Sequence, residues 1–259
     1  MSVQLSTFAI TKILDAMFNN TAVQIAQTYA SLHSGNPGGA GASELSGSGY
    51  GTRPAVTFGA PTGGVASNSG VVTNPTASGD WPQGTHHGLC DAPTSGNFVA
   101  GGSVTTPLTV LNGEVSEWAV GDLVTSFLSG TDYTWGTTTL ENIVNALFRN
   151  ISYVVAQAYA SLHTASPGVI GANEYASNGC ARFAVSFGAA GAGTIANDAA
   201  AQSPLASGDW TEVTHMGFWT LGSGGVFLLS KKLTTARTIR TGKRFRSAIG
   251  EITVTPEAG

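Results

Sequence analysis

Residues 77–88 read ASGDWPQGTHHG, and residues 206–217 read ASGDWTEVTHMG. The two segments lie 129 positions apart and share their acidic, aromatic and imidazole positions. Self-similarity at a fixed spacing indicates a repeated structural unit, so the neighbouring segments should recur as well. They do, because VQIAQTYASLH at 23–33 is matched by YVVAQAYASLH at 153–163.

The match runs nearly from end to end of the 259-residue chain, a length that suits two ordinary domains. The sequence therefore predicts one domain at 1–127, a linker at 128–136 and a second domain at 137–259. Both domains should have the same fold.

The composition favours short strands joined by many turns. Only 10% of the residues are charged, against the usual value of roughly 25%. A disordered chain would combine low hydrophobicity with high charge, whereas this chain is 42% hydrophobic and has 35 glycines. We predict a mainly β protein of two tandem antiparallel β-sandwiches, jelly-roll-like in strand count, each with an N-terminal amphipathic helix.

The two helices are predicted at 7–20 and 137–150, where apolar residues recur at helical spacing. Thr138 and Glu141 have the spacing of a capping box, which indicates a helix start there. The simplest interpretation of the apolar stripe is that it packs on a sheet. Insertion into a neighbouring subunit is the alternative.

Histidine and aspartate recur in both copies and could in principle bind a metal or act as acid and base. The ligand spacing of a metal site is missing, and no nucleophile has a recognisable context. We therefore predict structural roles: the aspartates cap tight turns, the tryptophans plug one end of the sandwich, and the histidines are strand residues. No metal or cofactor is expected. The positions concerned are Asp80, Trp81, His33, His86 and His87 in the first copy and Asp209, Trp210, His163 and His215 in the second.

Other signs of catalysis are also missing from the sequence. Glu114 and Glu117 are close together, but Lys243 and Arg246 occupy the matching positions in the second copy. The glycine-rich segments lack a phosphate-binding lysine. Neither cysteine has a counterpart in the other copy, so no disulfide framework is predicted. The chain is not expected to be an enzyme.

The charges of the two copies differ. Residues 1–130 hold two bases and seven acids, whereas residues 131–259 hold nine bases and eight acids. Seven of these bases form a candidate contact patch for an acidic surface, although a merely solvated strand face is the simpler alternative. One interleaved aromatic and no binding motif argue against nucleic acid as the partner. The patch consists of Lys231, Lys232, Arg237, Arg240, Lys243, Arg244 and Arg246.

The N-terminal residues lack the pattern of a secretory signal peptide, and no apolar stretch reaches the length of a membrane span. Synthesis in a cytoplasm is expected, with no membrane as partner.

The order of structural motifs resembles a known family. LHSGNPG and LHTASPG are followed by a glutamate, by AVTFG or AVSFG, and by ASGDW and a Thr-His pair. This order is similar to that of tailed-bacteriophage virion proteins usually labelled tail fibre or minor structural protein, here as two fused copies. The resemblance implies a β-sandwich component of the virion without catalytic residues.

Three functions fit this resemblance to different degrees. The main expectation is a non-enzymatic capsid decoration, or cement, protein that bridges capsid subunits. The alternative is a tail, collar or fibre component with possible host-surface binding. An enzyme that degrades host polysaccharide is disfavoured because it would need a carboxylate pair. The expected partners are other virion proteins, either the major capsid protein or tail proteins, and the chain should be oligomeric within the particle.

Overall fold

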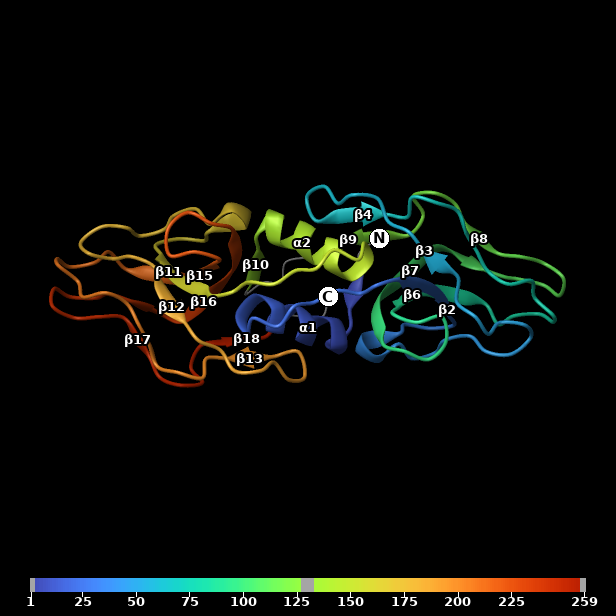
Figure 1. Cartoon of the computed structure of the whole chain (residues 1–259), viewed down its shortest axis with the longest axis horizontal. Helices are drawn as coiled ribbons and strands as arrows, with labels where there is room; N and C mark the ends of the chain where they lie inside the picture. The colour runs from blue at the N-terminus through green and yellow to red at the C-terminus, as the bar shows by residue number, and fades with distance from the viewer. Residues whose placement is uncertain (1–2, 127–132, 257–259) are drawn as a thin grey trace.

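The computed structural model describes residues 3–126 and 133–256. These residues form two similar halves that follow one another along the long axis of the molecule (Figure 1). The first half contains β1 (Gln4–Leu5), α1 (Thr7–Phe18), β2 (Thr28–His33), η1 (Gly38–Ala40), β3 (Ala55–Val56), β4 (Val65–Ser67), β5 (Val72–Thr73), β6 (Gly84–Cys90), β7 (Phe98–Leu108), β8 (Glu117–Trp118) and β9 (Val124–Ser126).

The second half repeats this order. It contains β10 (Tyr133–Trp135), α2 (Thr137–Phe148), β11 (Ala158–His163), η2 (Gly168–Ile170), β12 (Phe183–Val185), β13 (Ile195–Ala196), β14 (Ala201–Gln202), β15 (Val213–Trp219), β16 (Phe227–Arg237), β17 (Arg246–Ser247) and β18 (Thr253–Val254).

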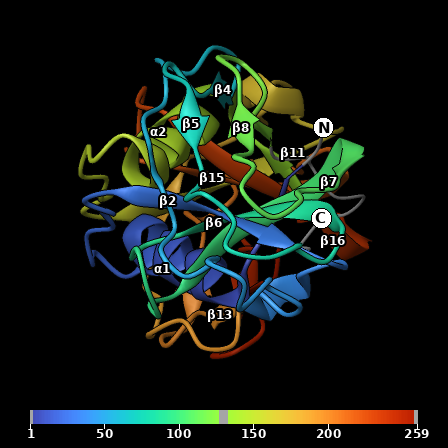
Figure 2. The ribbon, with the colours of Figure 1, turned by 90° about the vertical axis from the view of Figure 1, so that its right-hand side faces the viewer.

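Each half is built on one five-stranded antiparallel sheet. The strand order is β1-β7-β6-β2-β3 in the first half and β10-β16-β15-β11-β12 in the second. The two-stranded ribbons β4–β9 and β5–β8 accompany the first sheet, and β13–β18 and β14–β17 accompany the second. Seen from the first-half end, β5 and β8 stand to one side of β2, β6 and β7 (Figure 2). The prediction of a mainly β chain with two repeated halves, each opening with a helix, is confirmed.

The two helices begin in different ways. Ser6 caps α1, because its hydroxyl accepts a hydrogen bond from the Ala9 amide at 3.0 Å. Gly136 precedes α2 and gives no side-chain cap. The predicted capping box of Thr138 and Glu141 is therefore wrong. Instead, the Glu141 carboxylate accepts a bond from the Gly63 amide of the other half.

The halves meet at an approximate two-fold axis. Val23 and Tyr153 occupy equivalent positions in the two copies and exchange both backbone hydrogen bonds, each 3.0 Å long. The Ile25 amide donates to the Ala146 carbonyl, and the equivalent Val155 amide donates to the Ala16 carbonyl. These reciprocal bonds join the halves through their backbones.

The apolar stripe of each helix is buried between its own sheet and the other half. Ile13, Leu14 and Met17 of α1 are at most 1% exposed. Phe18 at the end of α1 lies 4.7 Å, centroid to centroid, from Phe187 of the second half, and the equivalent Phe58–Phe148 pair is 5.2 Å apart. The main prediction is that the apolar stripe packs on the sheet of its own half. That packing buries part of the stripe, and the other half of the chain buries the remainder.

The predicted linker lies partly outside the described residues, since 128–132 are not among them. Its residues 133–135 form β10, which pairs with β16 as the edge strand of the second sheet. The second structural unit therefore starts before residue 137. The matching edge strand of the first half is β1, which pairs with β7. Within the described ranges, no helix has the length and apolar character needed to cross a membrane.

Candidate functional site

The duplicated histidines make hydrogen bonds within their own half of the molecule. His33 and His86 are paired across β2 and β6, and the His33 ring bonds Ser31 and the Ala42 carbonyl. His163 in the second half makes the same two contacts, with Ser161 and Ala172. Burial lowers the pKa of both rings. Within residues 3–126 and 133–256, no three His, Cys, Asp or Glu side chains are placed to hold a metal ion.

Asp80 and Asp209 bind backbone amides, but not those of their own turns. Asp80 accepts from the Asn112 amide at 2.9 Å, and Asp209 accepts from the Thr241 amide at 2.8 Å. Each aspartate thus holds the facing loop of its half. The bonds from the Thr241 amide, and then the ion pair with Arg240, lower the pKa of Asp209 to about 2.

The neighbouring tryptophans are structural as well. Trp81 and Trp210 are 4% and 2% exposed, and their indole N–H groups donate to the Ser48 and Asn178 carbonyls. The ASGDW motif therefore fastens the glycine-rich loop and the facing loop of each half together. Its role is to fix the fold at the two ends of the molecule.

A bidentate ion pair braces each glycine-rich loop. Arg53 binds Glu44 through two nitrogen–oxygen contacts of 2.7 and 2.6 Å, and Arg182 binds Glu174 in the same way. Arg182 also stacks on Trp219, with its guanidinium carbon 3.5 Å from the ring centroid, where the first half has Cys90. These pairs position loops and leave no free catalytic carboxylate at this place.

The thiols are buried and free of disulfide bonds. Burial raises the pKa of Cys90, and burial also raises the pKa of Cys180 to about 12. A protonated buried thiol is a poor nucleophile.

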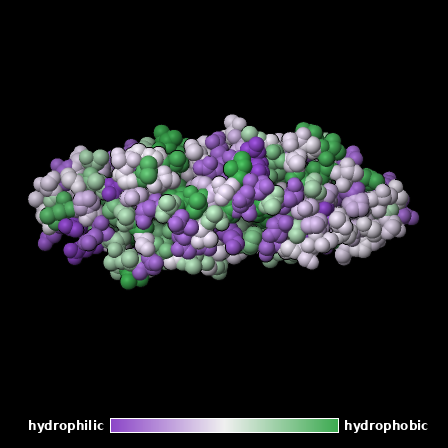
Figure 3. All heavy atoms as spheres, in the orientation of Figure 1, coloured by the Kyte–Doolittle hydropathy of each residue, from purple (hydrophilic) through white to green (hydrophobic). Residues whose placement is uncertain are grey.

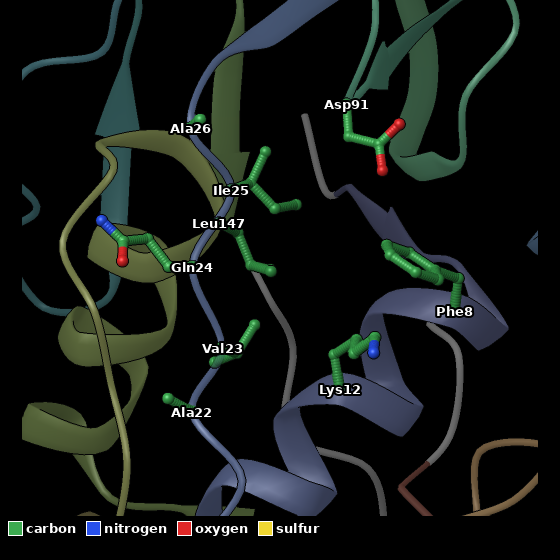
Figure 4. A pocket seen from close by; sticks show the side chains of 9 residues that line it. All are labelled: Phe8, Lys12, Ala22, Val23, Gln24, Ile25, Ala26, Asp91 and Leu147. Atoms are coloured by element: carbon green, nitrogen blue, oxygen red, sulfur yellow. The ribbon is translucent and has the colours of Figure 1, made fainter.

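A small cleft of about 260 Å³ lies beside the two-fold axis (Figure 4). Lys12 and Phe8 of α1 face it from one side, and Val23, Ile25 and Leu147 face it from the other. Asp91 borders it, but its carboxylate already accepts hydrogen bonds from the backbone and side chain of Asn97. The cleft therefore lacks a set of polar groups that converge on a ligand.

The basic residues predicted as a contact patch do lie together, on β16, β17 and the loop between them. Hydrophilic residues gather at the corresponding end of the molecule, the left-hand end in Figure 3. Arg240 pairs with Asp209 at 2.8 Å, and the Lys231 ammonium binds the Thr253 carbonyl at 2.7 Å. The remaining five have no ion pair with another described residue, and all five are exposed: Lys232, Arg237, Lys243, Arg244 and Arg246.

This basic patch borders a groove that occurs in both halves. In the second half the groove lies between β16 and the segment from β17 to β18 and has a volume of about 170 Å³. Its lining includes Met216, Lys231, Arg237, Arg246 and Glu251. The Lys231 side chain bridges the groove, because its ammonium reaches both the carbonyl and the hydroxyl of Thr253.

The first-half groove, between β7 and the segment from β8 to β9, is larger, at about 480 Å³. Its lining includes His87, Leu108, Glu117 and Asp122, the counterparts of Met216, Arg237, Arg246 and Glu251. Gly102 stands at the position equivalent to Lys231. Without a bridging lysine and with an acid in place of an arginine, the first-half groove is open and acidic.

His87 lines the first-half groove, is 1% exposed, and has an Nε2 atom without a hydrogen-bond partner among the described residues. Burial lowers the pKa of His87 to about 4, so the ring is neutral near pH 7. One nitrogen of a neutral imidazole is a hydrogen-bond acceptor.

No local sequence motif predicts this groove, because its lining comes from three separate segments. The signal that could have found it is the set of differences between the copies, above all Gly102 against Lys231 and His87 against Met216.

Comparison with known proteins agrees with the repeat. No curated protein sequence matches the chain. A family model described as Podophage GP4 fiber I protein gp80 matches twice, over residues 4–126 and 134–255. Each match spans one half of the structure, and together they cover most of the chain. The chain therefore belongs to the podophage GP4 fibre I protein gp80 family and carries two copies of the family's unit.

Proposed function

We propose that the protein is a non-enzymatic structural component of a phage tail fibre, and that its basic patch makes a protein–protein contact within the tail. The observation that carries the proposal is the match of both halves to a phage fibre protein family. This match favours the tail or fibre alternative over the expected capsid decoration role. Membership of the family makes the protein part of the virion.

The chemistry of the positions that recur in both halves supports a structural role. The histidines, aspartates and arginines that recur in both halves bind loops and strands of their own half. In the part of the chain that the structure describes, these contacts account for the candidate side chains that recur in both halves, whereas His87, which has no histidine counterpart, keeps an unpartnered Nε2. Function is therefore better sought on surfaces where the halves differ.

The basic patch is the clearest of these surfaces. Its bases lie at positions that hold no base in the first half, and two of them replace Glu114 and Glu117. Five exposed cations within one strand, one loop and one further strand create a positive field that attracts an acidic protein surface. We propose that this acidic surface belongs to a protein of the tail.

The location of the protein in the particle tests the fibre proposal. Purified virions can be labelled with gold-conjugated antibody against this protein and viewed by electron microscopy. Label on the tail fibres is the expected result. Label distributed over the head, with a copy number in the hundreds, would instead establish capsid decoration.

Charge reversal tests the patch. We expect Lys243→Glu, Arg244→Glu and Arg246→Glu together to lower the amount of protein in purified particles. The difference from the natural chain should shrink as salt is raised, because salt screens both the original attraction and the new repulsion. The matched control reverses the exposed Asp198 with Asp198→Lys. Unchanged occupancy of the triple variant would show that the patch is only a solvated face.

A further inference from the structure

The two grooves carry opposite charges on equivalent surfaces. The first-half groove has Glu117 and Asp122 at its border, and its described lining contains His87 but no lysine or arginine. The second-half groove has Lys231, Lys232, Arg237 and Arg246 in its lining, with Glu251 as its acid. A basic surface and an acidic surface at equivalent positions of the repeated fold are thus present on one chain.

The second half also shows which chemical group fits such a groove. Lys231 and Met216 are direct partners across β16 and β15, so their side chains share a face of the sheet. The lysine extends along that face to Thr253. In the first half, Gly102 and His87 are the corresponding partners, and no lysine is present to fill the space. An alkyl chain that ends in a cation therefore matches the open groove.

The groove offers suitable acceptors for this cation. The unpartnered Nε2 of His87 is unusual, because buried polar atoms are nearly always hydrogen-bonded. The fold does not require an imidazole there, since methionine occupies the equivalent position in the second half. Glu117 and Asp122 are exposed and already accept one hydrogen bond each, from the Thr73 hydroxyl and the Ala119 amide. A carboxylate has further lone pairs, so these two groups and His87 can accept hydrogen bonds from an ammonium or guanidinium group.

We propose that the first-half groove receives a lysine or arginine side chain from the basic patch of a second copy of this chain. The two surfaces belong to opposite halves of an elongated molecule, so a chain does not satisfy its own groove (Figure 1). The contact joins unlike surfaces, and such heterologous contacts build rings or filaments.

A second copy of the chain supplies the complementary charge, and the two kinds of surface are present in equal number. Every chain brings one acidic groove and one basic patch, so each contact leaves one surface of each kind for the next copy. Lys232, Arg237 and Arg246 are exposed and have no ion pair with another described residue. This inference rests on the proposed use of the basic patch and names its partner.

The test exchanges residues that the two halves already carry. Glu117→Arg places the second-half residue in the first-half groove, and Arg246→Glu does the reverse, so both residues are known to suit the fold. Sedimentation velocity of the purified full chain, at about 0.05 M and about 0.5 M salt, measures association. We expect concentration-dependent oligomers of the natural chain at low salt that dissociate at high salt.

Each single variant should raise the dissociation constant at least about tenfold, because each places like charges together. A mixture of the two variants should associate again, because the acidic groove of the Arg246→Glu chain meets the intact patch of the Glu117→Arg chain. The exposed control Asp198→Arg should associate like the natural chain. A monomeric natural chain at all concentrations and salts, or variants that associate unchanged, would overturn the proposal.

Gly102→Lys gives a second, independent readout. The new lysine would lie beside His87 and occupy the groove from within the chain, as Lys231 does in the second half. We expect this variant to remain monomeric, with a circular dichroism spectrum like that of the natural chain. Association of a folded Gly102→Lys variant would contradict the groove as the contact. Because these measurements use purified protein, they can fail while gold labelling still places the protein on the fibre.

Discussion

At the scale of single residues, the differences between equivalent positions are more informative than the identities. His87 and Met216 occupy the same place on the same strand, and both are buried. Only the histidine must remain uncharged to stay buried, because desolvation disfavours its charged form. The fold therefore becomes sensitive to acid at this position.

The acid sensitivity gives a prediction for His87→Met. The pKa of His87 lies at about 4 in the folded chain and near 6.5 when unfolded. The unfolded state thus gains a proton first, and stability present above pH 6.5 is lost as the pH falls towards 4. The difference in pKa corresponds to up to about 3 kcal/mol. In urea titrations at pH 7 and pH 4, the variant should lose less stability than the natural chain by about this amount. Equal losses in both proteins would contradict it.

Much of this residue-scale chemistry could be anticipated from the sequence. The contact of His33 with Ser31 fits the expected structural role of a strand residue. What could not be anticipated is the partner of each polar group. Asp80 binds the amide of Asn112, 32 positions away, and pattern reasoning does not reach contacts at that separation.

At the scale of elements, the helices and their caps show how tertiary contacts override local signals. Thr138 and Glu141 have the right spacing for a capping box, yet Glu141 binds Gly63 of the other half. On α1, the Thr11 hydroxyl likewise accepts a bond from the Gly193 amide. A turn of each half therefore docks on the helix of the other, a relation that periodicity alone does not reveal.

The two docking turns provide a matched pair of glycines for a test. Gly64 and Gly193 both have left-handed backbones, with φ of 80° and 78°. A Cβ at Gly64 would lie 2.6 Å from the Leu140 Cβ, whereas at Gly193 the nearest atom, Ile10 Cγ2, is 3.6 Å away.

Gly193→Ala should therefore cost only the backbone strain, about 1 kcal/mol. Gly64→Ala should cost about 2–4 kcal/mol, because the overpacked contact with α2 adds to that strain. Urea unfolding of both variants measures the difference. Equal destabilisation would show that the turn does not press on the helix as described.

At the scale of the whole molecule, the repeat was predictable but the way the halves join was not. The spacing of ASGDW and of the strand segments fixed the number of units. The joining depends on backbone pairing of Val23 with Tyr153 and on aromatic contacts such as Phe18 with Phe187. These residues look like ordinary core positions in either copy, so nothing in the sequence marks them as contacts between copies.

This shared core predicts that the two halves unfold together. The single-tryptophan variants that retain only Trp81 or only Trp210 would report on equivalent places in the first and second halves. Because helices and aromatic rings of both halves form one continuous core, we expect their urea midpoints to agree within about 0.2 M. Two separated transitions would mean that the halves are independent domains that merely touch.

The Val23–Tyr153 pairing has a consequence for any assembly of this protein. A symmetric dimer of two separate units has identical ends, and a row of such dimers reads the same from either side. Linking the units in one chain removes that constraint, because each end can then evolve its own charge. A filament of such chains has polarity, because one end of the filament always presents an acidic groove and the other end a basic patch. Growth at each terminus could then be stopped by a different capping protein.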